Sequence, residues 1–173
     1  MKVTCWMKQR ITKMFKSGKT IDQIMLAVPD VTATDINRVV RKHLFSLADE
    51  LWSTAVKIGG RCEISGETYN LEAHHPIRRD NLTYRWDLNN GVCLNNLVHS
   101  QADTDKEAFE ELLAERQPEK WGWYEKHKYE GGKPVKNDEL LQICKSLRQF
   151  IERSLYDARR KDIGARDRVG QAM

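Results

Sequence analysis

The sequence predicts a mainly helical chain with one small β-ribbon, which belongs to the α+β class. Apolar residues recur at helical spacing in the first third of the chain and again after residue 137. Between residues 61 and 94 the pattern is irregular and rich in turn signals, among them Ser65-Gly66 and Asn89-Asn90-Gly91. These features divide the chain into three expected units, residues 1–45, 46–130 and 131–173.

The composition excludes several broad classes of protein. The 173 residues include 29 Lys and Arg against 25 Asp and Glu, a formal net charge of +4, and 40% are hydrophobic, which excludes collagen and wholesale disorder. No run of about 18 apolar residues exists, so we expect no membrane span. The start, MKVTCWMKQR, lacks the apolar segment of a signal peptide. The four cysteines form no CxxC pair, so a reducing cytoplasm is the expected location.

Two short helices are expected at the start of the first unit. Ile11, Met14 and Phe15 are spaced for one helical face, and Ser17-Gly18 ends that helix. Thr20 and Gln23 then form a capping box that opens a second helix, and Pro29 ends it.

A third helix is expected to begin at Thr32 and to carry a basic side. The apolar pattern continues through residues 44–58 until Gly59-Gly60. Two short helices, a tight turn and a basic third helix are typical of a helix-turn-helix DNA reader. We therefore predict an N-terminal helix-turn-helix-like module with Arg38, Arg41 and Lys42 as DNA contacts, although a solvated helix face would carry the same charges.

The middle unit is expected to hold the β-ribbon and three short helices. Residues 69–75 and 92–94 favour strands, and residues 95–102 favour a helix. Thr104 and Glu107 form a second capping box that opens a helix to about residue 116. Pro118 restarts a helix, which passes through Trp121 and Tyr124.

The last unit follows a linker at residues 130–134. Asn137 is expected to cap a long helix with one apolar face, followed by a charged tail after Arg159. That apolar face suits either an internal core or a two-fold dimer, so both a monomer and a homodimer are expected.

Histidine is rare in this chain, and two of the five histidines are adjacent, His74 and His75. One imidazole can bind a metal ion while the other stays free as a base, because histidine has a near-neutral pKa and a good ligand nitrogen. His99 would supply a second ligand. Asp103 lies four residues further on, where it shares a helix face with His99.

Leu71–Arg79, the stretch Arg85–Val92 and His99 together resemble the ββα-metal motif of HNH, or His-Me finger, endonucleases of the phage type. The resemblance covers about residues 47–125. It implies an HNH nuclease unit that hydrolyses phosphodiester bonds of double-stranded DNA and leaves a 5′-phosphate and a 3′-hydroxyl. It also implies a phage or prophage gene whose product acts in the bacterial cytoplasm.

The resemblance further implies a role for each matching residue. His74 and His99 match metal ligands, and Asp103 matches a weaker position where some relatives carry a histidine. The expected cofactor is one divalent ion, Mg²⁺ first, with Mn²⁺, Ni²⁺ or Zn²⁺ as alternatives. His75 matches the general base, and Asn90 matches the residue that orients this base by a side-chain bond and braces the loop. The expected phosphate contacts are Arg79 and Arg85.

The chain departs from the family at the structural zinc site. Many relatives carry two CxxC pairs, whereas the matching segments here read Cys62-Glu63-Ile64-Ser65 and Asn95-Asn96-Leu97-Val98. One cysteine of four remains, so no structural zinc is expected. Packing is expected to hold this region instead, through Leu94, Leu97, Val98, Trp86 and the flanking helices.

The sequence is compatible with two other functions. One is a DNA-binding regulator or recombination accessory protein that keeps the nuclease fold without turnover. A nuclease specific for branched DNA or RNA would share the active site and differ only in its substrate.

Overall fold

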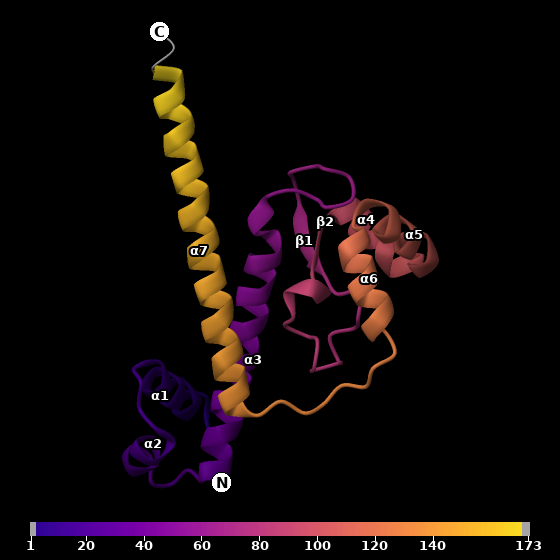
Figure 1. Ribbon diagram of the computed structural model, residues 1–173. Coiled ribbons are helices and arrows are strands. Elements are labelled where there is room, and N and C mark those ends of the chain that lie inside the picture. Colours follow the sequence, from indigo (N-terminus) through magenta and orange to yellow (C-terminus); the bar gives the residue numbers. More distant parts are fainter. Residues whose placement is uncertain (1–2, 171–173) are drawn as a thin grey trace.

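A computed structural model describes the backbone of residues 3–170 and the side chains of residues 3–160. The described chain is mainly helical and contains a two-stranded antiparallel sheet, which confirms the predicted α+β class (Figure 1). None of its helices is long and apolar enough to cross a membrane. The helices are α1 (Cys5–Lys16), α2 (Ile21–Ala27), α3 (Ala33–Val56), α4 (Asn96–Thr104), α5 (Lys106–Arg116), α6 (Pro118–His127) and α7 (Asn137–Gly170). The strands are β1 (Leu71–His74) and β2 (Val92–Asn95), and 3₁₀ turns η1 and η2 span Lys57–Gly59 and Leu88–Asn90.

The starts of α2 and α3 follow the predicted caps. The Gln23 N–H donates to the Thr20 hydroxyl at 3.3 Å, and the Thr20 N–H donates to the Gln23 side chain at 3.1 Å. The Thr32 hydroxyl accepts from the Asp35 N–H at 3.2 Å. Each cap satisfies an N–H that the first helical turn leaves unpaired, so the helix starts where the sequence places it.

The third helix is longer than a recognition helix. Neither glycine nor proline interrupts residues 33–56, so α3 runs unbroken through the boundary expected after residue 45. Its buried side packs against α1 and α2 at one end and against α7 along its length. These contacts share one apolar cluster, which includes Ile11, Ile24, Ile36, Leu44 and Leu140. The N-terminal helices therefore belong to the same core as the C-terminal helix.

The last helix lies alongside α3 and then extends beyond the rest of the chain (Figure 1). It continues past Arg159, where a frayed tail was expected, as far as Gly170. Residues 171–173 of that tail lie outside the described residues.

The strands and α4 follow one another as β-β-α. In the sheet, Leu71 pairs with Asn95 and His74 with Val92. A small second core lies between the sheet and α5, and it includes Cys62, Val92, Leu94, Phe109 and Leu113. The long connection from residue 75 to residue 91 lies against α3 and leads the chain back to β2 (Figure 1).

Gly91 allows that connection to approach α3 closely. A Cβ atom at this position would lie 2.3 Å from Cγ2 of Val56 and 3.1 Å from Cζ2 of Trp52. Only glycine fits between β2 and the α3 side chains, so the loop that leads into β2 is fixed against the helix.

One predicted helix start is wrong. Thr104 does not cap α5, because its hydroxyl donates back to the carbonyls of Ser100 and Gln101 at the end of α4. Asp105 is the cap instead, and its carboxylate accepts from the Ala108 N–H at 3.1 Å. The Thr104 hydroxyl, which suggested the start of α5, thus belongs to the end of α4.

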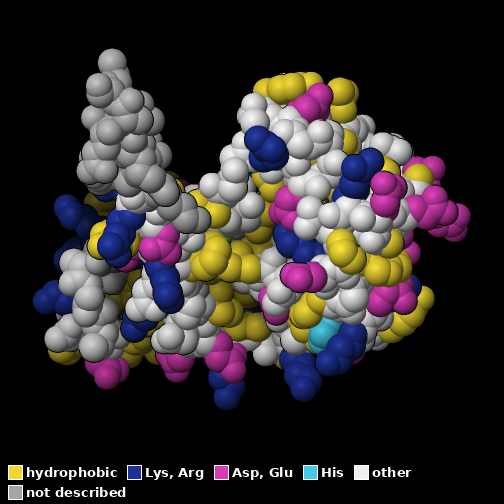
Figure 2. All heavy atoms as spheres, turned by 45° about the horizontal axis from the view of Figure 1, so that its top comes forward, with side chains coloured by type: hydrophobic (Ala, Val, Ile, Leu, Met, Phe, Trp, Pro, Cys, Tyr) yellow, Lys and Arg dark blue, Asp and Glu magenta, His cyan; other side chains and the backbone are white. Residues whose placement is uncertain are grey.

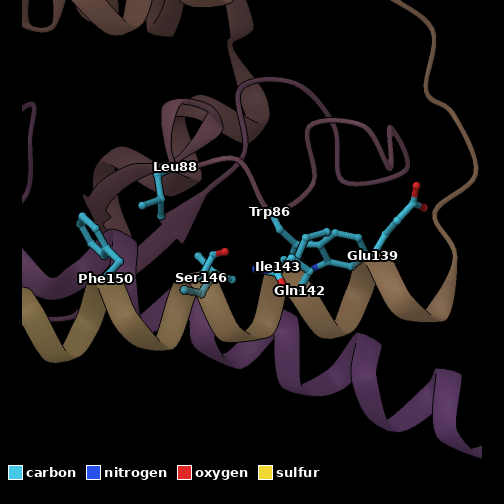
Figure 3. A pocket seen from close by; sticks show the side chains of 8 residues that line it. Trp86, Leu88, Glu139, Gln142, Ile143, Ser146 and Phe150 are labelled. Atoms are coloured by element: carbon cyan, nitrogen blue, oxygen red, sulfur yellow. The ribbon is translucent and has the colours of Figure 1, made fainter.

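An apolar groove of about 400 Å³ separates α7 from the loop before β2. On the face seen in Figure 2, hydrophobic side chains line the hollow between α7 and the part of the chain that contains the strands. Figure 3 shows Ile143, Ser146 and Phe150 of α7 facing Trp86 and Leu88 across this groove. The groove shares no lining residue with a second cavity, which is lined by His74, His75 and Asp103.

Candidate metal centre and active site

His74, His99 and Asp103 form one cluster, as the sequence predicts. Each side chain offers one ligand atom, and these atoms lie within 4.8 Å of one another. His74 is the last residue of β1, whereas His99 and Asp103 lie one turn apart on α4. The His74 Nδ1 atom lies 4.0 Å from Asp103 Oδ1, and the two imidazole rings meet edge to face with centroids 5.0 Å apart. Two imidazoles and a carboxylate at this spacing are a donor set that fits a divalent metal ion.

Burial keeps the His74 imidazole neutral. Its ring packs edge to face against Phe109 with centroids 5.0 Å apart. Loss of water around the ring, and then the neighbouring His99, lower the pKa of His74 to about 4. A neutral imidazole keeps the lone pair that a metal ligand needs, so His74 is ready to bind a cation at neutral pH.

The sequence analysis missed Glu72, which supports His99. The Nδ1–H group of His99 donates to the Glu72 carboxylate. With Nδ1 occupied, Nε2 is the nitrogen of His99 that keeps a free lone pair. The signal was present in the sequence, because Glu72 precedes His74 by two residues and strand alternation places both on one face.

His75 leaves the strand and points toward α3. Its ring stacks on the buried Trp52 indole, with centroids 3.7 Å apart and planes inclined by 15°. Its Nε2 lies 2.9 Å from the Arg85 carbonyl oxygen. A carbonyl only accepts hydrogen bonds, so Nε2 carries the hydrogen and Nδ1 keeps the lone pair. Burial is the main cause that lowers the pKa of His75, and the imidazole is therefore neutral at pH 7.

Asn90 does not orient His75, contrary to expectation. Its buried amide accepts from the Ile77 N–H at 2.8 Å and donates to the Ile77 carbonyl at 2.9 Å. The same amide nitrogen donates to the Tyr84 carbonyl at 3.0 Å. Asn90 thus braces the loop, as expected, while Arg85 and Trp52 hold the histidine. Trp52 lies 23 residues before His75, so no local pattern in the sequence predicts the stacking of these two rings.

Arg85 is not available to a phosphate, which corrects a second expectation. Its guanidinium pairs with both carboxylate oxygens of Asp49, at 2.9 and 2.8 Å, and donates to the Arg79 carbonyl at 2.7 Å. Asp49 also accepts from the Trp86 indole N–H at 2.8 Å. These bonds use the Arg85 side chain to hold the loop on α3. The Arg79 side chain is exposed.

Arg41 is the second basic residue whose expected role is corrected. Its guanidinium donates to the Val135 carbonyl at 2.6 Å and lies over the Phe45 ring, so it anchors the segment that leads into α7. Arg38 and Lys42 are exposed, and Arg38 lies 3.0 Å from Asp35. DNA contact by Arg38 and Lys42 stays a prediction.

Hydrogen bonds occupy the positions where the motif that the sequence resembles carries zinc-binding cysteines. The Cys62 sulfur accepts from the Ser65 N–H at 3.3 Å. The buried Asn95 amide donates to Glu67 and lies 3.5 Å from the Ser65 hydroxyl. Packing by Leu97 and Trp86 was expected here, but Leu97 is 66% exposed and Trp86 belongs to the core that contains α3. A polar network holds this turn together with Leu94 and Val98.

A cavity of about 370 Å³ brings the candidate residues together. His74, His75 and Asp103 all line it, although the two histidines point to different sides of the strand. A ligand in this cavity can therefore contact His74, Asp103 and His75 at once.

No protein-family model matches the chain, and no curated protein or solved structure is significantly similar to it.

Proposed function

We propose that this protein is a metal-dependent endodeoxyribonuclease of the HNH type. The observation that supports the proposal best is the cavity that His75 lines together with His74 and Asp103, two members of the His74, His99 and Asp103 cluster. A cation site beside a neutral, oriented imidazole is the arrangement that hydrolysis of a phosphodiester requires. The order of the elements, two antiparallel strands followed by a helix, supports the resemblance of the motif residues to that family.

His74, His99 and Asp103 would hold one divalent ion. When bound, the ion would supply positive charge to the phosphate and to the leaving oxygen. The donor set contains two nitrogens, which suit Mn²⁺, Ni²⁺ or Zn²⁺ better than Mg²⁺, because Mg²⁺ prefers oxygen ligands. The Glu72 carboxylate orients His99 and strengthens it as a ligand.

His75 would act as the general base. Its Nδ1 takes a proton from water while the water oxygen forms a bond to phosphorus. The bond between phosphorus and the 3′ oxygen then breaks, and the 3′ oxygen takes up a proton, which leaves a 5′-phosphate and a 3′-hydroxyl. The Arg85 carbonyl and the Trp52 face stabilise the positive charge that His75 acquires.

Cleavage of a supercoiled plasmid tests the proposal. We expect the wild-type protein to nick or linearise the plasmid with Mn²⁺, Ni²⁺ or Mg²⁺ and not with EDTA. His75→Ala should lower the rate by about a thousandfold, since a general base contributes about 10²–10⁴ in rate. His43→Ala is the matched control, because His43 lies in the middle of α3 against Phe15 and does not line the cavity.

Metal binding provides an independent readout. Titration calorimetry with Mn²⁺ should give one site per chain, which His74→Ala abolishes and His75→Ala retains. Absence of cleavage with every metal, together with a clear gel shift on DNA, would contradict the nuclease and favour a DNA-binding protein without turnover. If the protein does cleave, a panel of linear, nicked and four-way substrates separates a duplex nuclease from one specific for branched DNA.

A further inference from the structure

We propose that Arg78 and Lys106 form a phosphate-binding subsite in the cavity beside His75. The inference rests on the proposed function and assigns the subsite to a backbone phosphate of the bound DNA strand. Neither residue was singled out by the sequence pattern. The two expected phosphate contacts lie elsewhere, because Arg85 pairs with Asp49 and Arg79 does not line the cavity.

The two cations reach one cavity from different elements. Arg78 follows β1 in the loop, and Lys106 is the first residue of α5. Both line the cavity that also contains His74, His75 and Asp103. Their side chains are 88% and 69% exposed, so a ligand in the cavity can reach both. Arg78 lies 3.5 Å from the exposed Asp80, a surface ion pair that contributes little and that a phosphate can replace.

Buried groups hold the Lys106 side chain at this cavity. The Lys106 ammonium lies 3.3 Å from Glu110, and the buried Tyr124 hydroxyl donates to the same carboxylate oxygen at 2.6 Å. The ammonium also lies 5.9 Å from the centroid of the Tyr124 ring. One of its three N–H donors suffices for Glu110, which leaves the others for a ligand. Tyr124, with Glu110, raises the pKa of Lys106, so the ammonium stays charged.

The negative charges that line the cavity favour such a subsite, because a bound phosphate needs cations beside it. Asp103 and Glu110 both line it, and two carboxylates repel a phosphodiester. Arg78 and Lys106 offset this repulsion at the same place. The arginine offers a planar fork that matches two phosphate oxygens, and the lysine offers a point charge. Together they would hold the strand while His75 faces the bond to be cleaved.

Duplex binding in EDTA tests the subsite without any cleavage. A fluorescein-labelled duplex is titrated with each variant by fluorescence anisotropy over a series of salt concentrations. Arg78→Met and Lys106→Met should each weaken binding about tenfold and reduce the slope of log affinity against log salt by about one. Lys106→Arg should retain most of the affinity. Arg61→Met and Lys126→Met, which remove exposed charges outside the cavity, are the matched controls.

Plasmid cleavage separates the two proposals. If the wild-type protein cleaves, the two variants should raise KM more than they lower kcat. Wild-type affinity and salt slope in Arg78→Met and Lys106→Met would overturn the subsite and leave the nuclease standing. If the wild-type protein cleaves nothing while the two variants still lose affinity, the nuclease fails and the phosphate subsite stands.

Discussion

The helical bundle of α1, α2, α3 and α7 and the loop-rich part around the two strands are stabilised by different interactions. The bundle buries a continuous apolar cluster, in which Ile36 and Leu44 of α3 meet Leu140 of α7. The loop-rich part depends on side chains that hydrogen-bond to backbone groups, such as Asn90 and Lys120. Apolar packing in the bundle tolerates substitutions that keep the total volume of the core. The loop-rich part depends on single polar atoms, because each satisfies a particular backbone group.

α3 connects the two regions. One side of this helix carries the bundle core, and Asp49 and Trp52 on the same helix hold the loop that contains His75 and Arg85. The candidate active site therefore lies where the apolar region supports the polar one. Damage to the loop-rich part should therefore disturb the site directly, whereas damage to the bundle core should lower stability and leave the site of the folded protein intact.

Asn90→Ala should give the largest effect on stability. Its amide satisfies three backbone hydrogen-bonding groups of Ile77 and Tyr84, and unsatisfied buried groups cost about 1–3 kcal/mol each. We expect a loss of about 4 kcal/mol in the free energy of unfolding, measured by urea denaturation. Asn89→Ala is the control, because its exposed amide bonds only to Asp87. Equal stability of the two variants would refute the role of Asn90 as the brace of the loop.

Leu44→Ala tests the bundle in the same way. Leu44 is 1% exposed in the shared core, so its truncation leaves a cavity and should cost about 3 kcal/mol. Because His74, His99 and Asp103 lie in the other region, the Mn²⁺ affinity proposed for them should stay at the wild-type value at low temperature. Loss of metal binding in a folded Leu44→Ala protein would show that the two regions are not held separately.

The same contrast explains what the sequence could predict. The helices and two of their caps follow from periodicity and from local pairs such as Thr20 and Gln23, because these interactions act within one turn. The cluster of His74, His99 and Asp103 was predicted from motif spacing. The partners of Arg41, Arg85 and Asn90 were not, because they depend on loop geometry and on contacts between distant elements.

Asp49→Asn should give an intermediate effect that depends on pH. Burial raises the pKa of Asp49, but hydrogen bonds from Arg85 and Trp86 outweigh burial and hold it below the ordinary value of 3.8. The ion pair therefore stabilises the folded protein above about pH 4, and this contribution is lost as the pH falls through the lower folded pKa. We expect Asp49→Asn to cost about 2 kcal/mol at pH 7 and clearly less at pH 3. A difference that grows on acidification would contradict the pairing.

Ser65→Ala should give the smallest effect and tests the polar turn around Cys62 and Asn95. The Ser65 hydroxyl lies 3.2 Å from Glu67 and 3.5 Å from the Asn95 amide, but the Glu67–Asn95 bond does not need it. Its loss should therefore cost about 1 kcal/mol, with Ser100→Ala on the exposed face of α4 as the control. Asn95→Ala in the same series should cost more, because the Asn95 side chain also caps α4 through the Val98 N–H at 2.9 Å. If Ser65→Ala proved as damaging as Asn95→Ala, the hydroxyl would hold the turn as firmly as the amide does. Because several weak hydrogen bonds share the work of holding this turn, each substitution should lower the free energy of unfolding by a separate, small amount.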